Sequence, residues 1–431
     1  MTSVAPVTES SSTAKYSGAL AILTTLFFMW GLLTSLNDIL VPHLKSIFDL
    51  NYAEVMLVQF AFFSAYFLFS IPSGKLIDWL GYKKSMVVSL LVMAVGGLGF
   101  IAAAGVPSFS LFLAALLILG AGITALQVAA NPYVTVLGPA ATASSRLTLT
   151  QAFNSLGTTI GPPIGGLLIL AAAPKTAEEM RQMTAPVLQA YRVSQASSVK
   201  LPYLVLAGVL VLLAVAIGIS RLPAMSQAKR SGGAARSVWT YRHLVLGAIA
   251  IFVYVGAEVS IGSFLINYMS QPDIGNMTAR EASTFVPFYW GGAMVGRFIG
   301  SGVLQKVRPG KLLAIVAVGA CALVLTSMMT TGHTAMYSIL AVGLFNSIMF
   351  PTIFALGVAE LGPLTGDGSG VLATAIVGGA ILPLLQGALA DRKGIQFALM
   401  LPAICYLYIL FYGLKGSKPR GADRAIAANA G

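Results

Sequence analysis

Two carboxylic acids lie inside long apolar segments of this sequence, where a charge is unfavourable. Asp38 follows TTLFFMWGLLTSLN, and Glu258 lies in the middle of IFVYVGAEVSIGSF. An ionised carboxylate at the centre of a membrane-spanning helix costs roughly 2.5 to 3.5 kcal/mol on insertion scales, so each should face protein or water. A desolvated carboxyl group can bind and release a proton near neutral pH, and a carboxylate beside other oxygens can bind Na⁺. We therefore expect Asp38 and Glu258 to be candidates for cation coupling.

Asp38 shares a helical face with two other polar residues. Thr34, Asn37 and Asp38 stand at positions i, i+3 and i+4, which lie on one face of a helix. A polar stripe on a spanning helix must face protein or water rather than lipid. We expect this face to line a cavity, with Asn37 among the substrate-binding residues. The alternative is that Asp38 holds neighbouring helices together by hydrogen bonds.

Amide side chains recur at helical spacing in other apolar segments. Gln127 and Asn131 are four residues apart, and Gln151 and Asn154 are three apart. Amides donate and accept in one plane, which suits the alternating hydroxyls of a sugar, and aromatic rings suit its apolar face. Similar groups in the second half of the chain are Asn267, Tyr289, Trp290, Asn346 and Gln386. We expect these residues, with Gln127, Gln151 and Asn154, to bind a small sugar, although each one singly could instead join two helices.

The elements that position these residues are predicted to be membrane-spanning helices. Of the 431 residues, 57% are hydrophobic and 9% charged, whereas a soluble domain has about 25% charged residues. A bilayer span takes roughly 20 apolar residues, so twelve spans occupy almost the whole chain. The predicted spans are 18–47, 54–79, 84–104, 108–136, 147–172, 201–220, 243–269, 282–304, 311–330, 334–360, 369–390 and 395–414.

A basic linker divides these twelve helices into six plus six. We expect a cytoplasmic N-terminal tail at 1–17, an N-terminal six-helix bundle at 18–220, a cytoplasmic linker at 221–242, a C-terminal six-helix bundle at 243–415 and a cytoplasmic C-terminal tail at 416–431. With both termini in the cytoplasm, most of the 26 Lys and Arg residues fall on the cytoplasmic side, as the positive-inside rule requires. The net charge of +12 is scattered between apolar segments, so it predicts no nucleic-acid partner.

Other sequence features indicate loops and packing rather than catalysis. The segment GKLIDWLGYKK contains a candidate cytoplasmic gating motif, made of Gly74, Asp78, Gly81, Lys83 and Lys84; the alternative is an ordinary basic loop. The second half repeats its pattern weakly in GRFIGSGVLQKVRPGK, as expected for parallel repeats in a transporter. Gly157, Gly161 and Gly165 form a ladder for close helix packing. The three His and two Cys residues form no catalytic or metal-binding pattern, so we expect no enzyme activity, metal or cofactor.

Several segments resemble a known family. GKLIDWLGYKK resembles the loop signature of the major facilitator superfamily. FFMWGLLTSLNDILVPHLK, QVAANPYVTVLGP, SSRLTLTQAFNSLG and FPTIFALGVAELG resemble its fucose permease group, and most closely the bacterial glucose/galactose transporter branch. The resemblance implies a major facilitator fold in a bacterial inner membrane and cation-coupled (H⁺ or Na⁺) uptake of a hexose such as glucose or galactose by alternating access. The alternatives are an N-acetylglucosamine or fucose permease and, less expected, a metabolite exporter.

The sequence departs from the fucose permease pattern at the coupling acids. The resemblance implies one acid in the LND motif, which Asp38 matches, and a second just before AANP, where this chain has Gln127. Glu258 stands where the fucose permease has an amide, so we infer that the second acid has moved across the cavity; the alternative is a structural role for Glu258. Gln151 and Asn154 match sugar-binding amides of the family. Besides the sugar and the lipid bilayer we expect no partner, and we expect a monomer.

Overall fold

The computed structural model describes residues 18–35, 52–106, 108–169, 179–180, 182–197, 200–220, 222–223 and 237–419. Across these ranges the regular structure is helical, with no strand. Asn37 and Asp38, predicted on the first span, lie outside the described residues.

The helices of the first half follow the predicted spans closely. They are Gly18–Ser35, α2 (Tyr52–Gly105), the 3-10 turn η1 (Ala140–Thr142), α3 (Phe109–Val136), α4 (Ala143–Ile169), α6 (Ala185–Ser197) and α7 (Lys200–Ile219). The long helix α2 contains the second and third predicted spans in one run. It bends at Gly81, whose φ of 78° and ψ of 164° belong to a region that is essentially open to glycine alone.

The second half contains more interruptions than the sequence predicted. Its elements are η2 (Val238–Thr240), α8 (Arg242–Met269), α9 (Ala279–Ser283), α10 (Val286–Val303), α11 (Pro309–Met329), α12 (Gly332–Asn346), α13 (Met349–Gly357), η3 (Gly362–Leu364), α14 (Thr365–Thr374), η4 (Ala375–Val377), α15 (Gly378–Lys393), α16 (Ile395–Ala398), α17 (Met400–Phe411) and the π-helical turn η5 (Tyr412–Gly416). The tenth predicted span is thus divided into α12 and α13, and the eleventh into α14 and α15.

The number of membrane-spanning helices in the structure agrees with the twelve predicted from the sequence. Nine helical segments of the described chain are long and apolar enough to cross a membrane. The 46-residue segment Phe60–Gly105 bends at Gly81 and crosses twice. Adding α4 and α10, which pack against each other, gives twelve and confirms the fold class.

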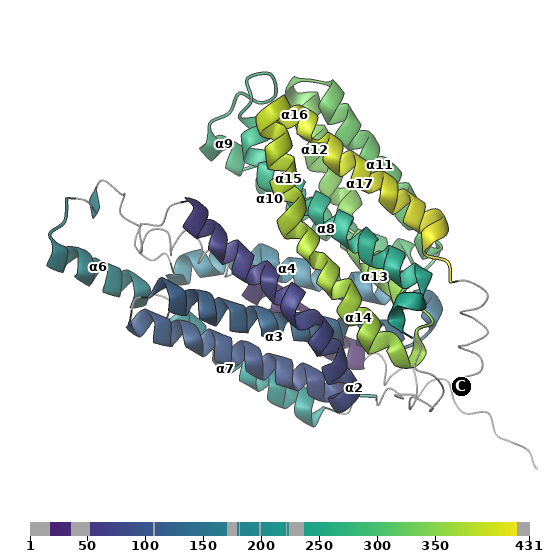
Figure 1. The fold of residues 1–431 in the computed structure, drawn as a ribbon, viewed down its shortest axis with the longest axis horizontal. Helices are drawn as coiled ribbons and strands as arrows, with labels where there is room; N and C mark the ends of the chain where they lie inside the picture. The colour runs from purple at the N-terminus through teal and green to yellow at the C-terminus, as the bar shows by residue number, and fades with distance from the viewer. Residues whose placement is uncertain are drawn as a thin grey trace, which may run out of the picture.

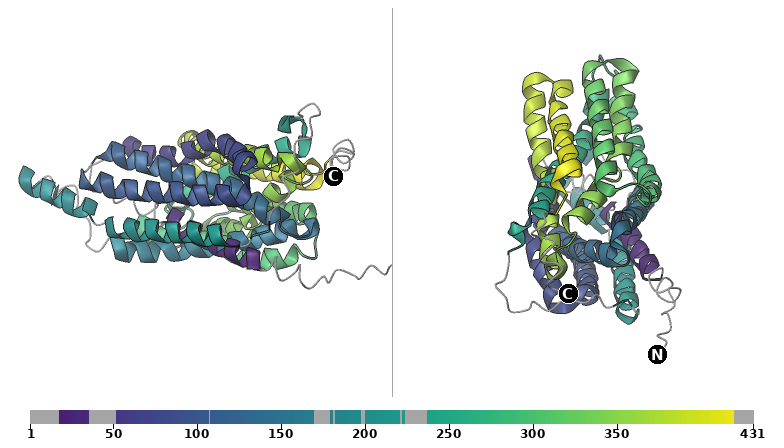
Figure 2. Two further views of the ribbon diagram at one scale, coloured as in Figure 1. Left: turned by 90° about the horizontal axis from the view of Figure 1, so that it is seen from below. Right: turned by 90° about the vertical axis from the view of Figure 1, so that its right-hand side faces the viewer.

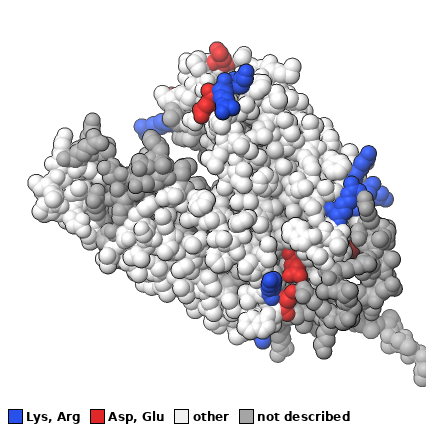
Figure 3. Space-filling view, viewed as in Figure 1, with Lys and Arg blue, Asp and Glu red and all other residues white. Residues whose placement is uncertain are grey.

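The two halves converge at one end of the molecule and diverge at the other. Figure 1 shows the first-half bundle, which contains α2, α3, α4 and α7, inclined against the second-half bundle. At the diverging end lie α6 of the first half and α9 of the second half. Figure 2 shows the long helices of each bundle running side by side. In Figure 3 the visible charged side chains gather toward opposite ends of the molecule, with a broad uncharged surface between them. This distribution is the one expected of a protein that crosses a bilayer.

Glycines bring the first helix into close contact with α4. A Cβ atom added at Gly157 would overlap the Phe28 carbonyl, and one added at Gly161 would overlap the Ser35 side chain. In return, a Cβ at Gly31 would overlap the Asn154 carbonyl. The Gly157 and Gly161 part of the predicted ladder is therefore confirmed as a packing surface, and it holds the amides of α4 close to the first helix.

Candidate functional site

A cluster of buried amides lies between α3 and α4. Gln127, Asn131 and Gln151 are each at most 5% exposed, and Gln151 Nε2 donates to Asn131 Oδ1 over 3.4 Å. Gln127 Oε1 and Asn131 Nδ2 have no hydrogen-bond partner among the described residues. A buried polar group without a partner costs about 1 to 3 kcal/mol. These two atoms are therefore available to a polar ligand or to water.

Asn154 is placed one helical turn from Gln151 and contacts the first helix. Its Nδ2 donates to the Phe27 carbonyl over 2.9 Å, and the side chain is part-buried. Asn154 therefore connects α4 to the helix that the sequence predicts to carry Asp38. The bonded residue, Phe27, packs its ring edge to face against Trp30.

Glu258 belongs to a buried hydrogen-bond network in the second half. Tyr254, one turn earlier on α8, donates its hydroxyl to Glu258 Oε1 over 2.7 Å and lies 3.0 Å from the Asn346 carbonyl. Tyr289 of α10 donates to the Glu258 carbonyl over 3.1 Å. Asn346 donates from Nδ2 to Tyr289 and accepts at Oδ1 from Tyr406, each over 2.8 Å. The carboxylate itself is bonded by Tyr254 of α8, and the surrounding network adds side chains from α10, α12 and α17.

The remaining predicted residues of the second half occupy different environments. Asn346 is fully buried, with both ends of its amide bonded to tyrosines. Gln386 on α15 is also buried, and its Oε1 has no partner in the described part of the chain. Trp290 is 42% exposed and packs edge to face on Tyr289, with ring centroids 5.1 Å apart.

Asn267 lies away from the Glu258 network. Its side chain is exposed, and it follows Glu258 by nine residues on α8, or about 13 Å along the helix at 1.5 Å per residue. Its carbonyl accepts a hydrogen bond from Gln271. The structure therefore does not bring Asn267 together with Glu258.

Arg297 is a prominent polar residue that the sequence analysis did not assign to the site. Its Nε donates to the Ser347 carbonyl over 3.1 Å, and its Nη1 donates to Ser155 Oγ on α4. Arg297 is also close enough to Glu258 for their charges to interact. The sequence signal for Arg297 is a basic residue inside the predicted span 282–304, although GRFIGSGVLQKVRPGK also makes it part of the repeated loop motif.

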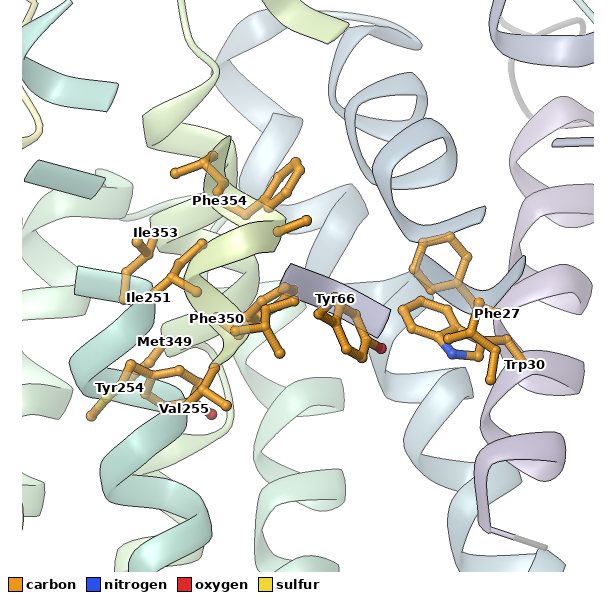
Figure 4. Close-up of a cluster of buried hydrophobic side chains, with 14 of the residues drawn as sticks. Phe27, Trp30, Tyr66, Ile251, Tyr254, Val255, Met349, Phe350, Ile353 and Phe354 are labelled. Carbon is orange, nitrogen blue, oxygen red and sulfur yellow. The ribbon is translucent and has the colours of Figure 1, made fainter. Parts of the chain in front are cut away.

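A buried aromatic cluster includes Tyr254 of the Glu258 network. Figure 4 shows Phe27 and Trp30 of the first helix, Tyr66 of α2, Phe350 of α13 and Tyr254 of α8 within one buried cluster. Both halves of the chain contribute to it. Aromatic rings in such a position can pack on an apolar ligand face.

The predicted gating motif lies where the two halves converge. A Cβ at Gly74 would lie 2.8 Å from the Gly366 carbonyl oxygen of α14, and one at Gly366 would lie 3.3 Å from Asp78 Oδ1. Lys83 Nζ donates to the Ser220 carbonyl over 2.8 Å, whereas Lys84 is exposed. The motif therefore contacts both its own half and the other half. Its bend at Gly81 turns the chain from the second span into the third.

Comparison with known proteins identifies the family of this chain. A family model described as Major Facilitator Superfamily matches residues 21–376. The chain belongs to the major facilitator superfamily.

Two relatives of this major facilitator protein cover nearly its whole length. It is 53% identical over 417 residues to a glucose/galactose transporter of Brucella abortus, covering 95% of this chain and 97% of that protein. It is 35% identical over 413 residues to the L-fucose-proton symporter of Escherichia coli, covering 94% of each. Its structure is similar to the crystal structure of FucP, a major facilitator transporter, in the outward conformation, with a TM-score of 0.86, 35% identity and coverage of 93% and 98%.

One acid stands out within the described spans of this major facilitator protein. Glu258 is the only Asp or Glu that is buried among the residues whose side chains the structure describes. Asp38, which the family resemblance implies as a coupling acid, lies outside those ranges. Gln127 occupies the position of the other implied acid and is buried beside Asn131 and Gln151, so the first-half cluster consists of amides.

Proposed function

We propose that this protein is a secondary active transporter that couples hexose uptake to the influx of H⁺ or Na⁺ by alternating access. The proposal is supported first by the buried, unpaired amide atoms of Gln127 and Asn131, which offer an acceptor and a donor to sugar hydroxyls. It is also supported by the 53% identity to a glucose/galactose transporter. Glucose and galactose are therefore the first substrates to test. As a member of a transporter superfamily, the chain is not an enzyme.

An alternative substrate within the same family is fucose. The L-fucose-proton symporter is 35% identical to this chain, and FucP has a similar structure. N-acetylglucosamine remains the other sugar to compare. We favour a hexose of the glucose or galactose type because the relative with that name has the higher identity.

In this proposal the two polar clusters have different roles. Gln127, Gln151 and Asn154 bind the sugar from the first half. Glu258 binds the coupling cation in the second half, and Asp38 is the candidate coupling acid of the first span. Asn346 holds the network around Glu258, and Gln386 offers one more unpaired acceptor.

The proposed membrane orientation places both termini and the gating motif in the cytoplasm. The converging end of the molecule, where Gly74 packs on Gly366, is then the cytoplasmic end, and the protein is in an outward-facing state. This agrees with the outward conformation named for FucP. We propose that the protein works as a monomer in a bacterial inner membrane.

Transport in vesicles tests the proposal directly. The purified protein is reconstituted, and uptake of labelled glucose is measured under a proton gradient or a sodium gradient imposed separately. One charge moving through 100 mV yields about 2.3 kcal/mol, which corresponds to about forty-fold accumulation.

The same vesicles test the choice of substrate, with unlabelled galactose, fucose and N-acetylglucosamine added as competitors. Glucose uptake that never exceeds the external concentration under either gradient would contradict coupled transport, and competition by fucose alone would favour the alternative substrate.

A further inference from the structure

The tenth span is interrupted beside Glu258, and a proline explains the interruption. α12 ends at Asn346 and α13 begins at Met349. Pro351 has no N–H, so it cannot donate to the Ser347 carbonyl four residues earlier. Arg297 Nε donates to that carbonyl instead, over 3.1 Å. The neighbouring Asn346 carbonyl lies 3.0 Å from the Tyr254 hydroxyl.

The Tyr254 hydroxyl has one proton and two possible acceptors. Glu258 Oε1 lies 2.7 Å away, and the Asn346 carbonyl lies 3.0 Å away. An ionised carboxylate is the stronger acceptor, so the proton points to Glu258 when that residue is charged. A protonated Glu258 becomes a donor and can donate to the Tyr254 oxygen, which directs the Tyr254 proton to Asn346. The acceptor of Tyr254 therefore follows the charge of Glu258.

Arg297 connects the same interruption to the first half. Its guanidinium donates to the Ser347 carbonyl and to Ser155 Oγ on α4. Ser155 is buried and is adjacent in sequence to Asn154. A change at the interruption can thus reach the contact between the halves through one side chain.

We propose that Tyr254 and Arg297 are positioning residues that link the charge of Glu258 to the interruption of the tenth span and to the contact at Ser155. Protonation of Glu258 releases the Tyr254 hydroxyl to the Asn346 carbonyl, and the shift at residues 346–348 is transmitted by Arg297 to α4. The inference rests on the proposed coupling role of Glu258, with H⁺ as the coupling cation. The charged and titratable groups that interact with Glu258 in the described chain are Tyr254, Arg297, Tyr289 and Tyr406.

The first test removes one hydroxyl at a time. Tyr254→Phe deletes the group that bonds Glu258, while Tyr406→Phe deletes a hydroxyl of the same network that bonds Asn346. Gradient-driven accumulation and gradient-free sugar exchange are measured for both, with sugar affinity of the purified protein as the folding control. We expect Tyr254→Phe to lower the ratio of accumulation to exchange about tenfold, the loss expected for a hydrogen bond to a charged group. The pH profile of accumulation should shift only in this variant.

The second test addresses the link through Arg297. Ser155→Ala removes the acceptor of Arg297 on α4. Ser145→Ala is the matched control, because Ser145 also joins α4 to α10, through a 2.7 Å bond to the Ser301 carbonyl. We expect the ratio of gradient-driven accumulation to gradient-free exchange to fall in Ser155→Ala and to stay at the wild-type value in Ser145→Ala.

The outcomes separate this inference from the proposed function. If Glu258→Gln retains full uphill uptake, the coupling role of Glu258 fails and the inference fails with it. If Glu258→Gln is uncoupled but Tyr254→Phe has the ratio and pH profile of Tyr406→Phe, the positioning role of Tyr254 is overturned alone. If Ser155→Ala and Ser145→Ala have equal ratios of accumulation to exchange, the proposed link from Arg297 to α4 is overturned. The double variant Tyr254→Phe, Glu258→Gln should be no worse than Glu258→Gln, because the two residues act in one network.

Discussion

Asn154 shows how one side chain combines a candidate binding role with a structural one. Its Nδ2 is bonded to the Phe27 carbonyl, whereas the nearby Gln151 has only a long bond to Asn131. A residue that is already bonded to the backbone of another helix contributes to stability as well as to any ligand contact. The two amides of α4 should therefore respond differently to truncation.

Truncation of these two amides gives a prediction at the scale of the residue. Gln151→Ala should weaken sugar binding about two- to tenfold, because it removes one hydrogen bond between neutral groups, which contributes about 0.5 to 1.5 kcal/mol. It should leave the unfolding temperature nearly unchanged. Asn154→Ala should weaken binding and also lower the free energy of unfolding by about 1 kcal/mol. Sugar titration and thermal unfolding in detergent measure both effects. Unchanged affinity in Gln151→Ala would remove that residue from the site.

Asp38 supports a second prediction of this kind. Asp38→Asn keeps the size of the side chain but cannot exchange a proton, and it removes the charge that would attract Na⁺. Uphill sugar accumulation should be abolished in vesicles, while exchange without a gradient should persist. Full accumulation by this variant would exclude Asp38 as the coupling group and would leave Glu258 as the candidate.

At the scale of the element, the bend of α2 depends on a single glycine. Gly81 has φ 78° and ψ 164°, and it separates the second span from the third in the gating motif. The same helix carries Gly74, which allows close contact with α14. The direction of both limbs, and therefore the contact between the halves, depends on the backbone at Gly81.

Substitution at Gly81 tests this dependence. Gly81→Ala should lower the free energy of unfolding by about 1 to 3 kcal/mol, because this backbone region is essentially restricted to glycine. Gly208→Ala on α7 is a suitable control: a Cβ there would meet no atom within 4 Å, and the change should stabilise the helix by about 0.5 to 1 kcal/mol. Thermal unfolding of both variants gives the comparison. Equal changes in unfolding temperature would show that the backbone conformation of Gly81 does not require glycine.

At the scale of the whole molecule, the two halves are joined at one end by matched contacts. α2 packs on α14, and α4 packs on α10, so each half supplies one partner to each contact. Ser145 Oγ on α4 bonds the Ser301 carbonyl on α10 over 2.7 Å. Alternating access requires these contacts to separate while those at the diverging end form.

A cross-link at this end gives a prediction for the transport cycle. Ser145→Cys with Ser301→Cys should form a disulfide on oxidation that holds the proposed cytoplasmic end closed. Transport should then stop and return on reduction, while either single variant should be insensitive to oxidant. The native Cys321 and Cys405 are buried, which limits interference. Full transport by the cross-linked protein would contradict a cycle that opens this end.

The sequence by itself determined the membrane fold, the number of spans and the family. Each of these depends on local properties: the length of an apolar segment, the position of charges around it, and motifs such as GKLIDWLGYKK. It also predicted buried amides on α3 and α4, because polar residues on spanning helices must avoid lipid.

Only the tertiary structure decided which polar groups meet. The network around Glu258 combines side chains from α8, α10, α12 and α17, and Arg297 reaches Ser155 on the other half. Helical periodicity specifies which residues share a face, but it does not specify which helix that face contacts. For the same reason the sequence predicted Asn267 to bind the sugar together with Tyr289 and Asn346, although its side chain is exposed.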